Sequence, residues 1–127
     1  MNKLILAFTL SLSSLSAFAC DVLVGSYGEC ISNAGSMGNE SLIIEVSEKG
    51  ITTNLDGESD LMPVGDSVYY DMPTNLKCVK DGAIITQVVG DGDTLVSKMS
   101  KNSEGSLVYE NKYSNGSITF ICEKNKF

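Results

Sequence analysis

The side chains that could do chemistry in this sequence are carboxylates, lysines, tyrosines and cysteines, because the chain of 127 residues contains no histidine. Histidine is the commonest general base and metal ligand, so its absence excludes Ser-His-Asp and Cys-His catalysis and histidine-rich zinc sites. Two carboxylates can hydrolyse a glycosidic bond only when they lie about 5–9 Å apart, and the sequence pattern places no acidic pair at such a separation. We therefore expect a protein that is not an enzyme, with no catalytic residues and no cofactor.

The acidic triplet Asp91-Gly92-Asp93 is the nearest approach to a metal-binding motif. Calcium requires several oxygen ligands, and an EF-hand loop would continue with a third acidic position and a glutamate at its twelfth position. Here the chain continues into a strand-like segment, and Asp-Gly is a common turn dipeptide. We interpret the triplet as a charged hairpin turn and expect no metal site.

Four cysteines, Cys20, Cys30, Cys78 and Cys122, are the other reactive side chains. An even number of cysteines in a small exported domain indicates disulfides, which form in oxidising compartments. A redox-active pair commonly has Cys-x-x-Cys spacing, and the sequence contains no such spacing. We therefore expect two structural disulfides.

Residues 1–19 have the pattern of a secretory signal peptide. A single lysine precedes a short apolar run, and Ala17 and Ala19 form an A-x-A cleavage site. A membrane span would need about 20 apolar residues, and serines interrupt this run. A cysteine after a cleavage site can be lipidated, but the bulky residue between the two alanines fits that signal poorly. We predict cleavage after Ala19, Cys20 as a disulfide partner rather than a lipid anchor, and a single domain at 20–127 in the periplasm or outside the cell.

The elements that must position these side chains are strands. Apolar and polar residues alternate along the chain, and turn residues separate the alternating runs. Asp-Gly and Asn-Gly dipeptides favour two-residue hairpins, which join antiparallel strands. The expected strands are 22–30, 42–46, 51–55, 68–70, 76–79, 83–89, 95–99, 107–113 and 118–123.

This pattern predicts an all-β fold, an antiparallel up-and-down meander of eight to ten strands. Such a meander either closes into a β-barrel or flattens into a two-sheet sandwich. We favour the barrel, because pairing of the first strand with the last removes both sheet edges. We expect a monomeric domain that is stabilised by its disulfides.

The meander also favours one of the three ways in which four cysteines can pair. If the first and last strands pair antiparallel, Cys20 lies at the same barrel end as Cys122. Cys30 then lies at the opposite end, where Cys78 on a middle strand can meet it. We therefore predict Cys20–Cys122 and Cys30–Cys78 disulfides.

Large apolar side chains are expected inside the barrel. Alternation places Tyr70, Met99, Tyr109 and Phe120 inward. It places Tyr69 outward, because neighbouring residues of a strand face opposite ways. A barrel of about eight strands has room either for packed side chains or for one small ligand. The leading hypothesis is therefore a non-catalytic binding module with a small apolar ligand in the barrel, and the alternative is an interior filled by its own side chains.

The run Val24-Gly25-Ser26-Tyr27 resembles the G-x-W opening of the first strand in lipocalins and their calycin relatives. In that family the aromatic residue plugs one end of the barrel beneath a basic residue of the last strand. The resemblance implies that Tyr27 is the plug, that Lys124 is its basic partner, and that the four inward residues line a ligand cup.

A second hypothesis follows from the net charge of −7. This charge repels phosphate backbones, so we expect no nucleic-acid partner. An acidic surface can instead dock a cationic protein by electrostatic steering. The acidic residues that lie closest together in the middle of the chain are Asp56, Glu58, Asp60, Asp66 and Asp71.

The layout also resembles small periplasmic lysozyme inhibitors, which are disulfide-tied acidic β-barrels. These proteins insert a Ser/Gly-rich loop into the cleft of a cationic enzyme. The nearest counterpart here is 63–69, which lacks the Ser-Gly core of that loop. The resemblance implies an inhibitor of a cationic enzyme as the alternative function.

Overall fold

The computed structural model describes residues 19–125 except 33, 37 and 91. The predicted signal peptide therefore lies outside the described residues except for Ala19, and so does Asp91 of the acidic triplet. In the described part of the chain, no helix has the length and apolar character needed to cross a membrane.

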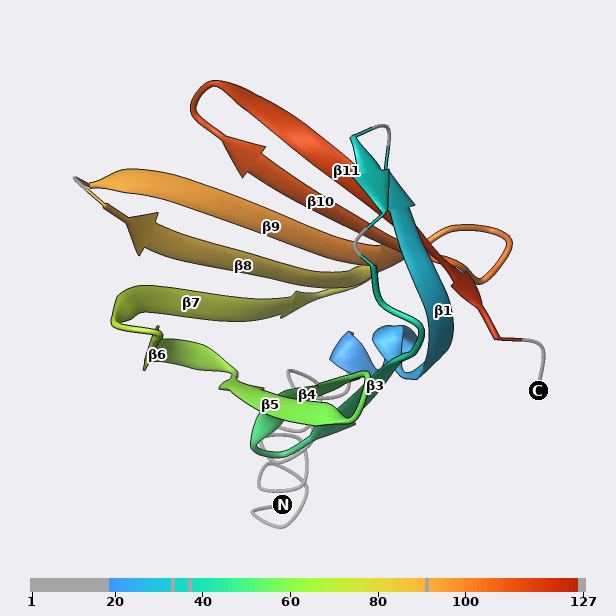
Figure 1. Ribbon diagram of the computed structural model, residues 1–127. Coiled ribbons are helices and arrows are strands. Elements are labelled where there is room, and N and C mark those ends of the chain that lie inside the picture. The colour runs from blue at the N-terminus through green and yellow to red at the C-terminus, as the bar shows by residue number, and fades with distance from the viewer. Residues whose placement is uncertain (1–18, 33, 37, 91, 126–127) are drawn as a thin grey trace, which may run out of the picture.

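The fold is all-β, as the alternation predicts, and Figure 1 shows its strands curling into a deep cup. A short 3-10 helix, η1 (Ala19–Leu23), precedes the strands. The strands are β1 (Gly25–Ser32), β2 (Gly35–Ser36), β3 (Leu42–Ser47), β4 (Gly50–Leu55), β5 (Glu58–Pro63), β6 (Gly65–Tyr69), β7 (Met72–Val79), β8 (Gly82–Val89), β9 (Asp93–Lys101), β10 (Leu107–Tyr113) and β11 (Gly116–Lys124).

All strands belong to one antiparallel sheet, in the order β5-β4-β3-β1-β11-β10-β9-β8-β7-β6, with the short β2 paired to β1. The first long strand thus pairs with the last, as predicted, and the sheet nearly closes into a barrel rather than splitting into a sandwich. The two edges are consecutive strands, β5 and β6, which Val64 joins without a ladder between them. We call this junction the seam.

Two tight turns show how the sequence shapes the hairpins. Asp56 and Gly57, between β4 and β5, both have positive φ angles of 50° and 93°, as an Asp-Gly hairpin turn requires. Tyr70 and Asp71, between β6 and β7, have φ angles of 51° and 63°. They form a turn of the same kind without glycine, so the chain reverses where alternation alone predicts a strand.

The inner face of the curled sheet forms the core. Its fully or nearly fully buried side chains come from strands on both sides of the barrel: Ile44, Ile51, Leu76, Ala83, Ile85, Met99 and Leu107. Helix η1 packs against β3, β7, β8 and β9 and covers one end of the barrel. Leu23 of this helix is completely buried, so η1 acts as an apolar cap on that end.

All four cysteines form disulfides, but the predicted pairing is wrong. The bonds are Cys20–Cys78 and Cys30–Cys122. Cys30 lies directly opposite Cys122 in the β1–β11 ladder, with Cα atoms 4.0 Å apart. Cys20 belongs to η1 rather than to β1, and η1 carries it beneath the barrel to β7, where its Cα lies 5.1 Å from that of Cys78.

The pairing has two consequences for the setting of the protein. The Cys20 sulfur that lipidation would use is bonded to Cys78. Two disulfides with no free cysteine among the described residues are typical of an oxidising, extracellular-type environment.

Candidate ligand-binding site

The interior of the barrel contains two adjoining cavities. The first lies beside the seam, has a volume of about 190 Å³, and is called the seam cavity. The second lies against the Cys30–Cys122 disulfide, has a volume of about 180 Å³, and is called the disulfide cavity. Thr53, Met99 and Tyr109 line both cavities, so the two form neighbouring compartments of one site.

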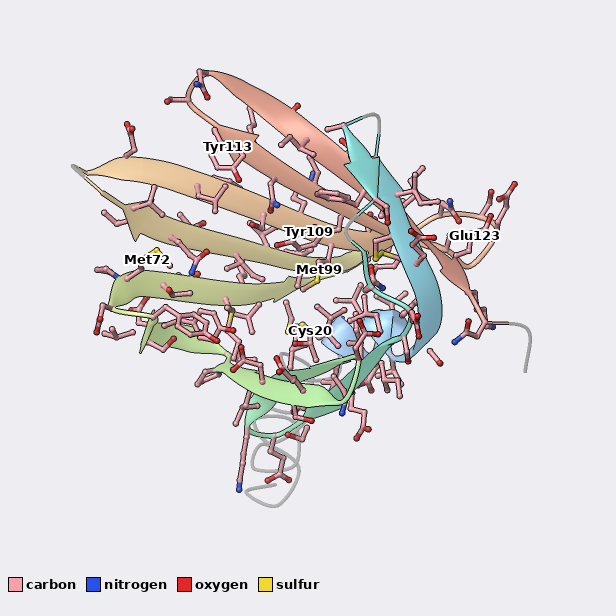
Figure 2. The ribbon with its side chains drawn as sticks, in the orientation of Figure 1. Cys20, Met72, Met99, Tyr109, Tyr113 and Glu123 are labelled. Atoms are coloured by element: carbon pink, nitrogen blue, oxygen red, sulfur yellow. A yellow bond between two sulfur atoms is a disulfide. The ribbon has the colours of Figure 1, made fainter. Side chains whose placement is uncertain are left out.

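The disulfide cavity has a mainly apolar wall. Besides the three shared residues, its lining consists of Cys30, Leu42, Ile44, Leu55, Leu107 and Cys122. Figure 2 shows the labelled Met99 and Tyr109 close together in the middle of the molecule, over the bend of the sheet. This compartment therefore suits an apolar group of small size.

The seam cavity is more polar. Beyond the three shared residues, its lining consists of Ile51, Asp60, Met62, Tyr69, Leu76, Ile85, Gln87 and Ser97. The Tyr69 hydroxyl donates a hydrogen bond to Oδ2 of Asp60 across the seam. Burial, and then the hydrogen bond and charge of Asp60, raise the pKa of Tyr69, so its hydroxyl stays protonated at neutral pH.

Further hydrogen bonds hold the polar wall in place. Gln87 Nε2 donates to Thr74 Oγ1 at 3.3 Å, and Ser97 Oγ donates to Asn111 Oδ1 at 2.7 Å. The first bond joins β7 to β8, and the second joins β9 to β10. Each polar side chain is thus positioned by the neighbouring strand.

The structure places three of the four predicted interior residues inside the barrel. Met99 is buried, and Tyr109 is half-buried and lines both cavities. Phe120 packs against the core beside Tyr109, with ring centroids 6.4 Å apart, but lines neither of the two cavities.

Tyr70 is the exception, because its side chain is 74% exposed. The reversal of the chain at Tyr70 and Asp71 ends β6 at Tyr69 and places Tyr70 in the turn. Tyr69, expected to face outward, is the tyrosine that lines the seam cavity. The predicted orientations of the two neighbours are therefore exchanged.

Tyr27 is completely buried near the capped end of the barrel. Its hydroxyl donates a hydrogen bond of 2.8 Å to the carbonyl oxygen of Leu23 in η1, and burial raises the pKa of Tyr27 to about 12. Tyr27 thus lies between η1 and the sheet, and the role of barrel plug that the lipocalin resemblance implies stays a prediction.

Lys124 lies opposite Tyr27 in the β1–β11 ladder, but the cation over the Tyr27 ring comes from another strand. Lys101 of β9 lies over the Tyr27 ring, with Nζ 5.6 Å from the ring centroid, and donates to the Val24 carbonyl at 3.1 Å. Lys124 is exposed, and its side chain runs past Gly105 instead. Burial, and then the charge of Lys124, lower the pKa of Lys101.

The polar wall of the seam cavity is what the sequence analysis missed. Gln87 lies in the expected strand 83–89, and strict alternation from the buried Ile85 places it inward. Asp60, which the sequence pattern assigns to an acidic surface, is half-buried and lines the cavity. Asp60 faces the cavity because it lies opposite Thr53 in the β4–β5 ladder. The register of that ladder cannot be derived from the sequence pattern.

No family model matches the sequence, and a search of the curated proteins finds no match. Within the described ranges, no group of three or more His, Cys, Asp or Glu side chains is arranged to hold a metal ion. The site must therefore be interpreted from its own geometry.

Proposed function

We propose that this protein is an exported, non-catalytic binding module that holds one small, mainly apolar ligand inside its β-barrel. The observation that supports the proposal is the pair of adjoining cavities that meet at Met99 and Tyr109. Each is a partly open pocket whose volume exceeds the roughly 150 Å³ that accommodates a benzene ring.

The position of the cavities also fits a binding role. They lie within the barrel, where a small β-barrel can hold one small ligand, and the disulfide Cys30–Cys122 forms part of the wall of the disulfide cavity. The lipocalin resemblance of the Gly25–Tyr27 segment supports the same function. The disulfides are consistent with a place in the periplasm or the extracellular space.

Filling the shared part of the cavities is expected to abolish binding. In a Thr53→Phe variant, a phenyl ring takes up volume that both compartments share. Phenylbutanol is a suitable neutral probe, because its ring and short chain match the two compartments. We expect the variant to bind this probe about tenfold or more weakly than the wild type, because the ring leaves little free volume. Isothermal titration calorimetry measures the difference.

Thr52→Phe is the matched control. Thr52 is the neighbouring residue of β4 and faces the opposite side of the sheet, so this variant should bind phenylbutanol as the wild type does. Circular dichroism and thermal unfolding establish that both variants are folded. A wild-type protein that binds none of this probe, or a Thr53→Phe variant that binds it fully, would contradict a ligand site in the barrel.

A second candidate function is an acidic surface that docks a cationic protein, such as a cationic enzyme that the domain inhibits. The observation that favours it is the exposed Tyr70 ring beside Asp71, because tyrosine is enriched among the residues that contribute most to protein–protein contacts. Asp60 no longer counts toward this surface.

A lysozyme is a suitable cationic probe for this candidate. If the surface docks it, wild-type protein should slow its cleavage of cell walls, and high ionic strength should weaken the effect. Tyr70→Ala should reduce the inhibition, whereas Tyr113→Ala, which removes an exposed tyrosine of β10, should leave it unchanged. Full lysozyme activity in excess wild-type protein at low ionic strength would remove the inhibitor interpretation.

A further inference from the structure

The seam cavity contains a carboxylate whose role the fold alone does not explain. Asp60 is the charged residue among those that line the two cavities. Its hydrogen bonds come from the Tyr69 hydroxyl and, at 3.4 Å, from the Tyr70 hydroxyl. Both end on Oδ2, and a carboxylate can accept about four hydrogen bonds. Within the described residues, Oδ1 is therefore available to a further donor.

A ligand in the cavity would change the solvation of the Asp60 carboxylate. An apolar body that fills the cavity displaces water from around Asp60, and a desolvated carboxylate is costly unless it is paired with a cation and hydrogen-bonded. Among the described residues, no lysine lines the two cavities, and the chain contains neither histidine nor arginine. A ligand that covers Asp60 can therefore supply the compensating positive charge itself.

The neighbouring compartment indicates what the rest of the ligand is. The wall of the disulfide cavity combines aliphatic side chains with the Cys30–Cys122 disulfide, and its volume of about 180 Å³ suits one ring or a short branched chain. Since Thr53, Met99 and Tyr109 border both cavities, one molecule can occupy them together. Its apolar part would lie by the disulfide and its polar head by Asp60.

The net charge of the molecule also favours a cationic ligand over an anionic one. The net charge is −7, and an excess of negative charge raises the local concentration of cations and repels anions. An anionic amphiphile would meet both this field and the Asp60 carboxylate.

We propose that the barrel selects a small monocationic amphiphile, a protonated amine on an apolar body, with the ammonium group bound by the Asp60 carboxylate and the body in the disulfide cavity. This inference rests on the proposed function and names the ligand class of the same site. The ammonium donates to Oδ1, while Tyr69 and its hydrogen bond to Oδ2 hold the carboxylate in position. Charge-assisted bonds of this kind are about twice as strong as neutral ones.

The test compares two probes of the same shape, phenylbutylamine and phenylbutanol, by isothermal titration calorimetry at neutral pH. The wild type should bind the amine about tenfold or more tightly than the alcohol, because only the amine pairs with the carboxylate. Asp60→Asn should lose this preference by weakening amine binding alone. Asp66→Asn is the matched control, since Asp66 lies on the outer face of β6 and accepts from Asn75, and it should keep the full preference.

The outcomes separate the two proposals. If the wild type binds both probes with equal affinity, the cavity is a ligand site but Asp60 does not select a cation, so this inference is wrong. If the wild type binds neither probe, the proposed function itself is wrong. If Asp60→Asn weakens binding of the alcohol as much as binding of the amine, Asp60 shapes the cavity through Tyr69 rather than contacting the ligand, and this inference is wrong. The comparison of probes on the wild type needs no variant, so it stands even if Asp60→Asn fails to fold.

Discussion

Replacing Cys30 and Cys122 together with alanine is expected to lower the free energy of unfolding by about 4.6 kcal/mol in the chain-entropy account of disulfides. The bond joins residues 92 apart in the sequence, so its loss frees most of the unfolded chain. For a domain of this size, such a loss lowers the melting temperature by about 15 °C or more. Thermal unfolding and urea titration of the double variant, under non-reducing conditions, measure both quantities.

The variant without Cys20 and Cys78 is the comparison. This bond spans 58 residues, and the entropy term depends only logarithmically on that length, so the two losses should agree to within about 1 kcal/mol. The two variants should differ in which segment loosens. Loss of Cys20–Cys78 removes the covalent link between η1 and β7, whereas β1 and β11 remain joined by their ladder when Cys30–Cys122 is lost. A loss of less than about 1 kcal/mol for the Cys30–Cys122 pair would show that the ladder alone holds the first and last strands together.

Tyr27→Ala should be the most damaging single substitution outside the cysteines. Tyr27 is completely buried, and its removal opens a large cavity between η1 and the sheet. Aromatic-to-alanine changes at such positions cost about 3–5 kcal/mol. The contact of Lys101 with the ring would be lost as well. We expect a correspondingly lower midpoint in urea unfolding, measured by circular dichroism.

Tyr27→Phe separates the ring from its hydroxyl. Phenylalanine keeps the ring packing and the Lys101 contact and removes only the bond to the Leu23 carbonyl, so it should cost about 1 kcal/mol. An equal loss in the free energy of unfolding for Tyr27→Ala and Tyr27→Phe would mean that the hydrogen bond, rather than the packing of the ring, holds η1 against the barrel.

The architecture was predictable because it depends on patterns that repeat along the chain. The period of two and the turn dipeptides are local, and each hairpin adds its strand next to the preceding one. They therefore predict an antiparallel meander without knowledge of any distant contact. Asp56-Gly57 illustrates this, since both residues adopt the positive φ angles that the dipeptide favours.

The errors arose where distant segments meet or where a turn has no glycine. The disulfide pairing depends on the register of β1 against β11, which shifts between Tyr27 and Cys30, and no local pattern encodes that shift. Tyr70 and Asp71 form a turn despite their side chains, so alternation was continued through a reversal. The orientation of Tyr69, and hence the polar character of the cavity beside it, could not be predicted without that turn.

The barrel lacks a backbone ladder along one line, the seam between β5 and β6. A barrel closed by ladders all the way round can widen only by breaking backbone hydrogen bonds. Here β5 and β6 lack a shared ladder, and the Tyr69–Asp60 side-chain bond bridges them, with Val64 as the covalent hinge. This side-chain bond is therefore a polar contact that ties the two edge strands together. Widening the barrel along this junction would break that side-chain bond and leave every ladder between the described strands intact.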